Sequence, residues 1–179
     1  FNVQKRFLEM IDEDKIEIPP QIEEEHPVLN YQRITKNANG DTPEELIKEI
    51  RKIYFAMIAT LDNMLGEFFN AIDNMDLKKD TYIIFTSDHG EMAMEHGQIL
   101  KYIMYEPSVH IPLIISGPEV KKGEEETDLV SLIDIFPTVM DMAQKEHPKG
   151  LQGESLMPVL TGKGKKERDW TFSEYHGDR

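Results

Sequence analysis

The chain has 179 residues, a length that suits one domain with a single hydrophobic core. Its 20 Lys and Arg residues stand against 34 Asp and Glu residues, which gives a formal net charge of −14 at pH 7. Nucleic acids and anionic membranes attract basic surfaces, so this charge argues against either as a partner. It does not exclude an anionic small molecule, because a local pocket can be positive within an acidic protein.

The sequence contains no Cys, which excludes disulfides and thiolate metal ligands. No apolar run reaches the roughly 18 residues of a membrane-spanning helix. The chain begins at Phe1 and shows no signal peptide, and we expect the true N-terminus of the protein to lie elsewhere. The compartment, whether cytoplasmic, periplasmic or secreted, therefore stays open.

Residues 1–42 have no regular period, and their prolines and turn residues predict an extended, irregular segment. A long helix is predicted next. Thr42 is a suitable N-cap, Pro43 suits the first helical position, and acidic residues follow at the positive end of the helix. Apolar residues then recur at helical spacing to about Asn74: Leu46, Ile50, Ile53, Met57, Leu61, Leu65, Phe68 and Ile72. Small residues at its middle predict that this helix is packed on both sides.

Two short runs rich in β-branched and aromatic residues, 81–86 and 111–116, predict buried strands. Residues 129–143 predict a helix in which Pro137 marks a start or a break, and 170–173 is a possible last strand. Helices that alternate with buried strands predict an α/β fold, with a mainly parallel or mixed central sheet flanked by helices.

Polar side chains suited to chemistry follow the strand 81–86. Asp88 and His89 stand directly after it, and Gly90 lets the backbone turn sharply. Ligands of open α/β sheets bind beyond the carboxyl ends of strands, and a carboxylate with an imidazole there makes half of a divalent metal site. Lys101 follows as a point charge suited to a tetrahedral anion. A metal and a lysine that meet at one anion would stabilise charge on sulfuryl or phosphoryl oxygens.

Four motifs in this order resemble the sulfatases of the alkaline-phosphatase superfamily, closest to the arylsulfatase K group and the bacterial arylsulfatases. They are Ser-Asp-His-Gly-Glu (87–91), Glu-His-Gly (95–97), Lys-x-x-Met-Tyr-Glu (101–106) and His-x-Pro-Leu-Ile (110–114). The resemblance also covers 54–66, 130–138 and 173–177, and so most of the chain from about His26 onward.

The resemblance implies a role for several of these residues. Asp88 and His89 would bind one calcium ion. Lys101 would contact the sulfate oxygens and serve catalysis, together with His110. His96 and His176 would lie on the substrate side. In such enzymes the nucleophile is a formylglycine made from Cys or Ser in a Cys/Ser-x-Pro-x-Arg motif.

The sequence departs from the family pattern in what it lacks. It has no Cys and no Ser-x-Pro-x-Arg, and the paired aspartates that complete the metal shell are absent. The family order places all of these upstream, and a small C-terminal subdomain downstream. We therefore expect residues 1–179 to be the C-terminal portion of a sulfatase catalytic domain that is inactive alone and, when intact, hydrolyses sulfate esters of sugars or small molecules.

Two other functions stay open at this point. A phosphomonoester or phosphonate hydrolase of the same superfamily shares the Asp-His pair and differs in its nucleophile and metals. A non-catalytic fragment with a vestigial anion site is the other. Simpler explanations also remain for single residues: Lys101 as a solvated surface lysine, and His96 and His110 as hydrogen-bonded packing histidines. The oligomeric state is open.

Overall fold

The computed structural model describes residues 3–20, 26–36, 42–166 and 168–174. Internal contacts divide the chain into two compact units. The first contains Phe1–Asn74, His89–Ile111 and Tyr175–Arg179, and the second contains Met75–Asp88 and Pro112–Glu174. Each unit is described by itself.

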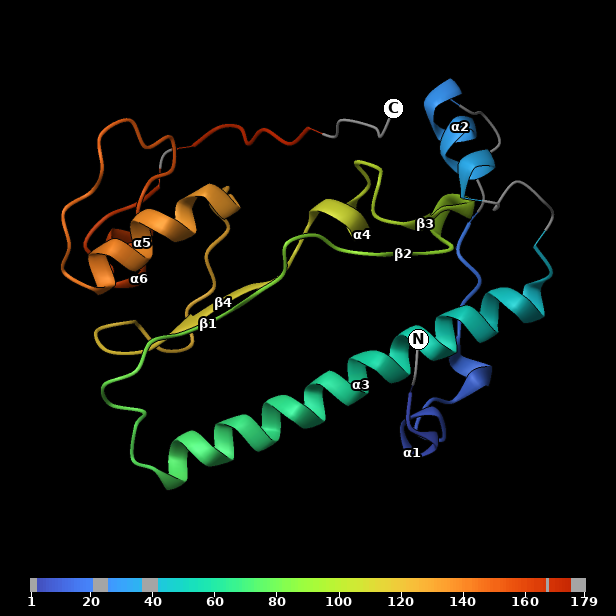
Figure 1. Cartoon of the computed structure of the whole chain (residues 1–179), viewed down its shortest axis with the longest axis horizontal. Helices are drawn as coiled ribbons and strands as arrows, with labels where there is room; N and C mark the ends of the chain where they lie inside the picture. The colour runs from blue at the N-terminus through green and yellow to red at the C-terminus, as the bar shows by residue number, and fades with distance from the viewer. Residues whose placement is uncertain (1–2, 21–25, 37–41, 167, 175–179) are drawn as a thin grey trace. The chain divides into compact units, whose positions relative to one another are not determined.

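A long helix, α3 (Glu44–Asn74), organises the first unit (Figure 1). It begins directly after Pro43 with Glu44 and Glu45 in its first turn, where carboxylates favour the positive end of the helix dipole. The predicted helix and its end at Asn74 are confirmed. The short helix α1 (Lys5–Leu8) packs against α3, and Phe7 and Ile47 are buried there. The other helices before α3 are η1 (Glu13–Lys15) and α2 (Pro27–Thr35).

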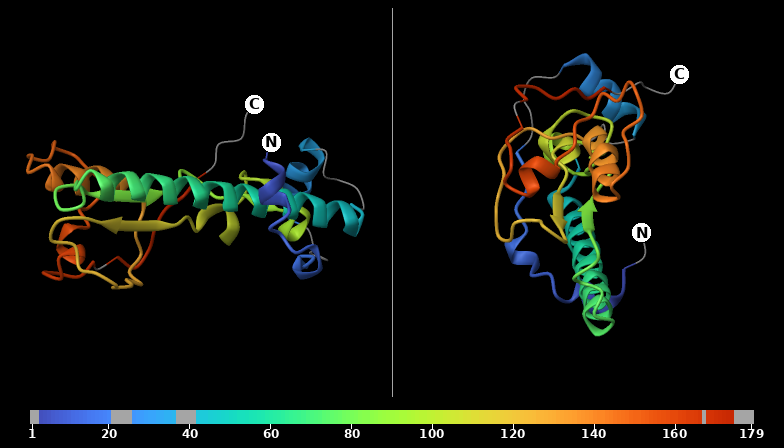
Figure 2. Two further views of the ribbon diagram at one scale, coloured as in Figure 1. Left: turned by 90° about the horizontal axis from the view of Figure 1, so that it is seen from below. Right: turned by 90° about the vertical axis from the view of Figure 1, so that its left-hand side faces the viewer.

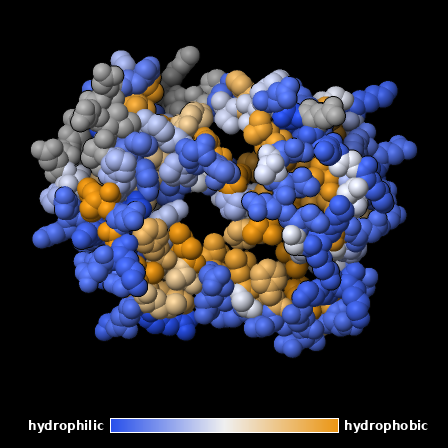
Figure 3. Space-filling view, turned by 180° about the vertical axis from the view of Figure 1, so that it is seen from behind, coloured by the Kyte–Doolittle hydropathy of each residue, from blue (hydrophilic) through white to orange (hydrophobic). Residues whose placement is uncertain are grey.

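Part of the apolar surface of α3 is exposed. Ala56 is fully buried, yet Ile58 and Leu61 are 48% and 46% exposed. Phe68 and Phe69 are also exposed farther along the helix. Figure 3 shows hydrophobic side chains lying open among polar ones on one face of the molecule. The expectation of a helix packed on both sides is therefore wrong for the part of the chain that the structure describes.

A small hairpin completes the first unit. Strands β2 (Met92–Ala93) and β3 (Ile99–Leu100) pair antiparallel, with Met92 opposite Leu100 and Ala93 opposite Ile99. The one-turn helix η2 (Glu95–Gly97) lies between them, and the short helix α4 (Glu106–Val109) follows. We call residues 92–100 the 92–100 hairpin. Strand β2 lies against α3, and Met92, Ala93 and Met94 are buried.

The second unit contains the two predicted strands, β1 (Ile83–Thr86) and β4 (Leu113–Ser116), which lie side by side in Figures 1 and 2. They pair antiparallel, with Ile83 opposite Ser116 and Thr86 opposite Leu113. This pair does not fit a mainly parallel sheet and corresponds to the mixed form of the expected sheet. The antiparallel register places the end of β1 beside the start of β4.

Three short helices follow in the second unit: η3 (Leu132–Asp134), α5 (Ile135–Met142) and α6 (Met157–Leu160). Pro137 lies in the first turn of α5, where its missing N–H costs no helical hydrogen bond. The Thr138 hydroxyl on α5 accepts a hydrogen bond from Leu156 N at 2.8 Å, which ties α5 to the start of α6. The possible strand at 170–173 is not formed, so that prediction is wrong.

Asp134 joins the C-terminal segment to these helices. Its fully buried carboxylate accepts two hydrogen bonds from Arg168, at 2.8 and 2.9 Å, and lies 2.8 Å from Lys166 Nζ. The backbone N–H groups of Ser131 and Glu154 donate to it as well. Burial would raise the pKa of this carboxyl, but the hydrogen bonds, led by that of Arg168, outweigh it and hold the pKa below its ordinary value.

Within the described ranges, no helix combines the length and the apolarity needed to cross a membrane.

Candidate functional site

Gly90 allows two segments of the first unit to meet backbone to backbone. Its N–H donates to Ser108 O at 2.8 Å, and the N–H of Glu91 donates to Pro107 O at 3.0 Å. A Cβ built on Gly90 would lie 1.9 Å from Pro107 O, far inside van der Waals contact. Only glycine permits this approach, which brings the residues around His89 beside those at α4.

Ser108 extends the same connection to Lys101. Its side chain is buried, and its hydroxyl donates to Lys101 O at 2.8 Å while its own carbonyl accepts from Gly90 N–H. One small residue therefore ties the Asp-His-Gly motif to the lysine motif. Sequence reasoning missed Ser108, and nothing in its local pattern distinguishes it from an ordinary helix-turn serine.

The side chains of His89 and Lys101 meet as a result. Lys101 Nζ lies 2.5 Å from His89 Nε2, and His89 Nδ1 lies 2.8 Å from Gly90 O. A carbonyl oxygen only accepts, so Nδ1 carries the proton and Nε2 presents its lone pair to the lysine ammonium. A backbone carbonyl that holds Nδ1–H is also how metal-ligating histidines fix the tautomer that binds through Nε2.

His96 lies in the 92–100 hairpin in a left-handed conformation, with φ of 56°. Its ring centroid lies 4.2 Å from that of Tyr105, with 31° between the ring planes. This contact joins two of the motifs that the sequence singled out. It also gives His96 a packing partner, so both the substrate-side prediction and the packing explanation remain compatible with its position.

His110 caps the C-terminal end of α4 and is open to solvent. Its side chain is 78% exposed, and Nδ1 lies 2.8 Å from Glu106 Oε2, one helical turn earlier. Because the carboxylate accepts, Nδ1 carries the proton and Nε2 is the nitrogen left for another partner. Such exposure does not suit a packing histidine.

Asp88 is an exposed carboxylate two positions after the end of β1, in the second unit, and Ser87 Oγ lies 3.4 Å from Asp88 Oδ1. His89, the next residue, belongs to the first unit. The roles predicted for this pair as metal ligands stay predictions. His176 lies outside the described residues, so its predicted role also stays a prediction.

The donor set suits a divalent cation but is incomplete. A carboxylate and a neutral imidazole, whose Nε2 has a lone pair, are two acceptable ligands. Across 3–20, 26–36, 42–166 and 168–174, no group of three or more His, Asp or Glu side chains could hold a metal ion. A calcium ion takes six to eight oxygen ligands, so these two residues cannot saturate one.

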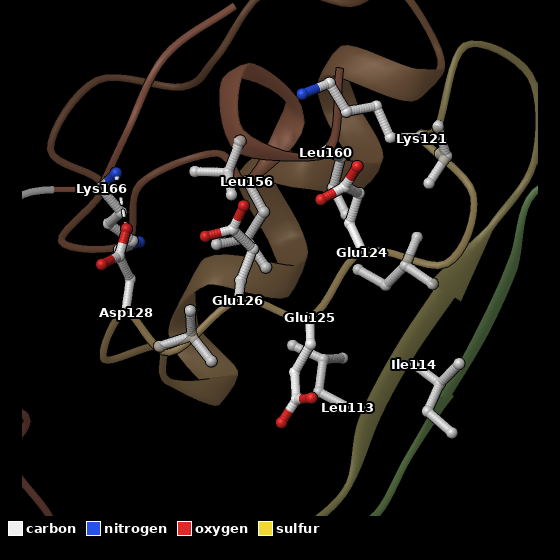
Figure 4. Close-up of a pocket in the computed structure, with 14 residues that line it drawn as sticks. Leu113, Ile114, Lys121, Glu124, Glu125, Glu126, Asp128, Leu156, Leu160 and Lys166 are labelled. Carbon is white, nitrogen blue, oxygen red and sulfur yellow. Dashed lines mark hydrogen bonds between the residues drawn. The ribbon is translucent and has the colours of Figure 1, made fainter. Parts of the chain in front are cut away.

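The second unit contains a separate cavity of about 360 Å³ (Figure 4). Its wall is apolar, with Leu113, Leu156 and Leu160, and acidic residues follow one another along the loop at its edge. None of the predicted site residues lines it. The cavity therefore gives no support to the predicted chemistry.

Comparison with known proteins identifies relatives of this chain. The Sulfatase family model matches residues 19–145. Arylsulfatase K from Gallus gallus is 42% identical over 180 residues, which cover 96% of this chain and 34% of that protein. The chain thus spans about a third of the length of the curated relatives it matches.

Solved structures agree with this match. The phosphonate monoester hydrolase SpPMH from Silicibacter pomeroyi is similar with a TM-score of 0.83 and 26% identity, over 93% of this chain and 35% of that chain. A protein solved in complex with its substrate D-glucosamine-2-N,6-O-disulfate is similar with a TM-score of 0.66 and 31% identity, over 84% of this chain and 33% of that chain. The fold is the alkaline-phosphatase-like α/β fold of these enzymes. The chain belongs to the sulfatase family.

Proposed function

We propose that the full-length protein containing this chain is a sulfuric ester hydrolase that acts on sulfate esters of sugars or small molecules. The observation that carries this proposal is the pair formed by Lys101 and His89, in a chain of the sulfatase family. It brings a cation that can hold an anionic oxygen beside an imidazole that can hold a metal ion.

Lys101 has the properties of an anion-binding group. Its side chain is exposed at the surface of the first unit, while its backbone is tied to buried Ser108. The ammonium would donate to sulfate oxygens and stabilise the charge that grows on them as the ester bond breaks. Its backbone anchor limits the entropy that Lys101 loses when it orders around the substrate.

Asp88 and His89 would hold one divalent ion, and we propose calcium. When bound, the ion would supply positive charge and Lewis acidity at the sulfuryl oxygens. The Nε2 lone pair of His89 cannot serve a metal ion and Lys101 together. Metal binding would therefore leave the Lys101 ammonium free to donate to the substrate. The remaining ligands and the formylglycine nucleophile would come from residues outside this chain.

The other histidines would complete the substrate side. His110 holds its Nδ1 proton toward Glu106, which orients Nε2 for proton transfer. The His96 ring is held by Tyr105 and would contact the substrate, and His176 would do so as well. A sulfated carbohydrate suits this proposal, because one structural relative was solved with its substrate D-glucosamine-2-N,6-O-disulfate.

The test is a comparison of esters with the purified full-length protein. We expect 4-nitrophenyl sulfate to be hydrolysed with a kcat/KM at least about tenfold above those of 4-nitrophenyl phosphate and a phenylphosphonate monoester. The similarity to the phosphonate monoester hydrolase makes the phosphonate the sharpest competitor. A preference for the phosphonate would assign the alternative hydrolase function, and turnover of none of the three would support the non-catalytic alternative.

The metal is tested in the same assay. Activity should be lost after treatment with EGTA and restored by calcium. Restoration by magnesium or manganese but not by calcium would retain the hydrolase and reject the proposed ion.

A further inference from the structure

Arg51, on α3, is joined to the 92–100 hairpin by two short polar contacts. Arg51 Nη1 lies 2.8 Å from Ala93 O and 2.5 Å from Glu95 Oε1. The other oxygen of Glu95 accepts from Ala93 N–H at 2.6 Å, which closes a ring of contacts. The two side chains are only 14% and 24% exposed, so water screens this ion pair less than a surface pair.

The hairpin held by this contact has an unfavourable backbone. Met94, His96 and Leu100 have φ values of 75°, 56° and 68°, in the left-handed region that non-glycine residues rarely adopt. Such conformations persist only where the surroundings over-determine them. The hairpin's own hydrogen bonds, such as Met94 N–H to Gln98 O at 3.0 Å, act within it, whereas Arg51 connects it to a long helix.

The environment of Arg51 is not the one that maximises stability. Its guanidinium carbon lies 5.4 Å from the centroid of the Phe55 ring. Its Nε is buried, and among the described residues it has no hydrogen-bond partner. A buried donor without a partner is a cost, and an apolar side chain of similar volume would avoid it. A gain in positioning would explain why an arginine stands here.

The hairpin contains His96 and directly precedes Lys101, and both residues belong to the proposed site. His96 follows Glu95 directly, and its ring lies against Tyr105. Leu100, with its left-handed φ, directly precedes Lys101, whose ammonium reaches His89. A small rotation of the hairpin would therefore move His96 and the start of Lys101 together.

We infer that Arg51 is a positioning residue that acts through Glu95: it fixes the 92–100 hairpin on α3 and thereby places His96 and Lys101 for the substrate. This inference rests on the proposed function for its catalytic consequence. The structural consequence, which is the local order of the hairpin, does not depend on the proposed function.

The experiment compares Arg51→Met with Lys52→Met in the full-length protein. Lys52 is the matched control, because it is the next residue on α3 and forms its 2.8 Å ion pair with Glu13 rather than with the hairpin. Arg51→Met should lower kcat for a sulfate ester by about tenfold to a hundredfold, with a smaller change in KM. Lys52→Met should leave both within about twofold.

Hydrogen–deuterium exchange gives a second readout that needs no activity. Arg51→Met should speed exchange at residues 92–101 and leave residues 135–142 in α5 unchanged, and Lys52→Met should change neither. Arg51→Lys should recover part of kcat, because an ammonium can still reach one of the two acceptors. If Arg51→Met does not fold, Glu95→Gln weakens the same link more gently and is read in the same way.

The outcomes separate the inference from the proposed function. No sulfatase activity in the wild-type protein would reject the proposed function, while the exchange data would still decide whether Arg51 orders the hairpin. Wild-type kcat in an active Arg51→Met variant would overturn the inference. Faster exchange throughout the protein would also overturn it, because Arg51 would then act on stability alone.

Discussion

The ammonium nitrogen of Lys101 lies 2.5 Å from Nε2 of His89, 12 positions earlier in the chain. Neither residue reaches the other by local geometry. The contact depends on the absent side chain of Gly90 and on buried Ser108, which together hold the two backbones.

Removing the lysine amine should impair turnover and leave the fold intact. We expect Lys101→Ala to lower kcat/KM for a sulfate ester about a hundredfold, because a charge-stabilising donor is lost. Its side chain is exposed, so the melting temperature should stay within about 2 °C. Steady-state kinetics and thermal unfolding measure the two effects. Unchanged kinetics would remove Lys101 from the site.

A methyl group at Gly90 should destabilise the protein. Its contact at 1.9 Å is with backbone, which cannot rotate away as a flexible side chain does, so Gly90→Ala should cost about 1–3 kcal/mol in the free energy of unfolding. Gly66→Ala is the matched control, since a Cβ built there would have no atom within 4 Å apart from the adjoining backbone of its own helix. It lies within α3 and should stabilise the protein by about 0.5–1 kcal/mol. Urea denaturation checks both, and equal effects would contradict the close approach.

Loss of the Ser108 hydroxyl should leave the carbonyl of Lys101 without this donor. We expect Ser108→Ala to cost about 0.5–1.5 kcal/mol in the free energy of unfolding, the net contribution of one part-buried hydrogen bond. Because Lys101 would then be less well ordered, KM for the sulfate ester should rise as well. A variant with wild-type stability and wild-type KM would show that this hydrogen bond does not support the site.

Acid should weaken the protein through Asp134. The folded-state pKa of this carboxyl lies below its ordinary value of 3.8, so its contribution is fully present above about pH 4 and is lost as the pH falls through the folded pKa. Asp134→Asn should cost about 3–5 kcal/mol at pH 7, because Arg168 and Lys166 lose their counter-charge. Below pH 4, the free energy of unfolding of Asp134→Asn should fall less steeply than that of the wild type.

Asp141→Asn is the control for that experiment. Asp134 directly precedes α5 and Asp141 lies on it, but the Asp141 side chain is 38% exposed and pairs with His147 at 2.7 Å. A partly exposed pair contributes little, so we expect a loss below about 1 kcal/mol. Urea unfolding at pH 7 and at pH 3 measures both variants. Parallel pH profiles for wild type and Asp134→Asn would reject the linkage.

Calcium should bind weakly to the 179-residue chain alone. Asp88 and His89 offer too few ligands, so we expect a dissociation constant above about 0.1 mM. Isothermal titration calorimetry measures it, with Asp88→Ala as the control. Micromolar affinity in the chain, lost in Asp88→Ala, would show that it holds a more complete site than its described residues indicate.

The parts of the fold that depend on local sequence could be predicted. The bounds of α3 follow from Pro43, the acidic first turn and a repeating apolar stripe, all of which act over a few residues. The strand at Ile83–Thr86 follows from its β-branched and aromatic composition. The direction of the β1–β4 pair is set by where the chain returns, which the local sequence of the two strands does not determine.

The site was predictable as a set of motifs, but its internal contacts were not. Spacing alone does not bring Lys101 to His89, since the approach depends on a backbone contact with Ser108. Spacing also does not reveal that Arg51, within a regular helical pattern, forms an ion pair with Glu95. Resemblance supplied the roles that we predict for single residues, whereas the supporting hydrogen bonds arise from tertiary packing.

The pairing of Thr86 with Leu113 has an evolutionary consequence. Residues 87–112, which include all the motif residues from Asp88 to His110, leave and rejoin the sheet at neighbouring positions. The ends of this segment are fixed by strand pairing, and lengthening a closed loop adds little entropic cost. Insertions and replacements between these ends would leave the strand register intact. The antiparallel pair thus lets the segment that contains the predicted site residues change in length or sequence while both of its ends stay fixed.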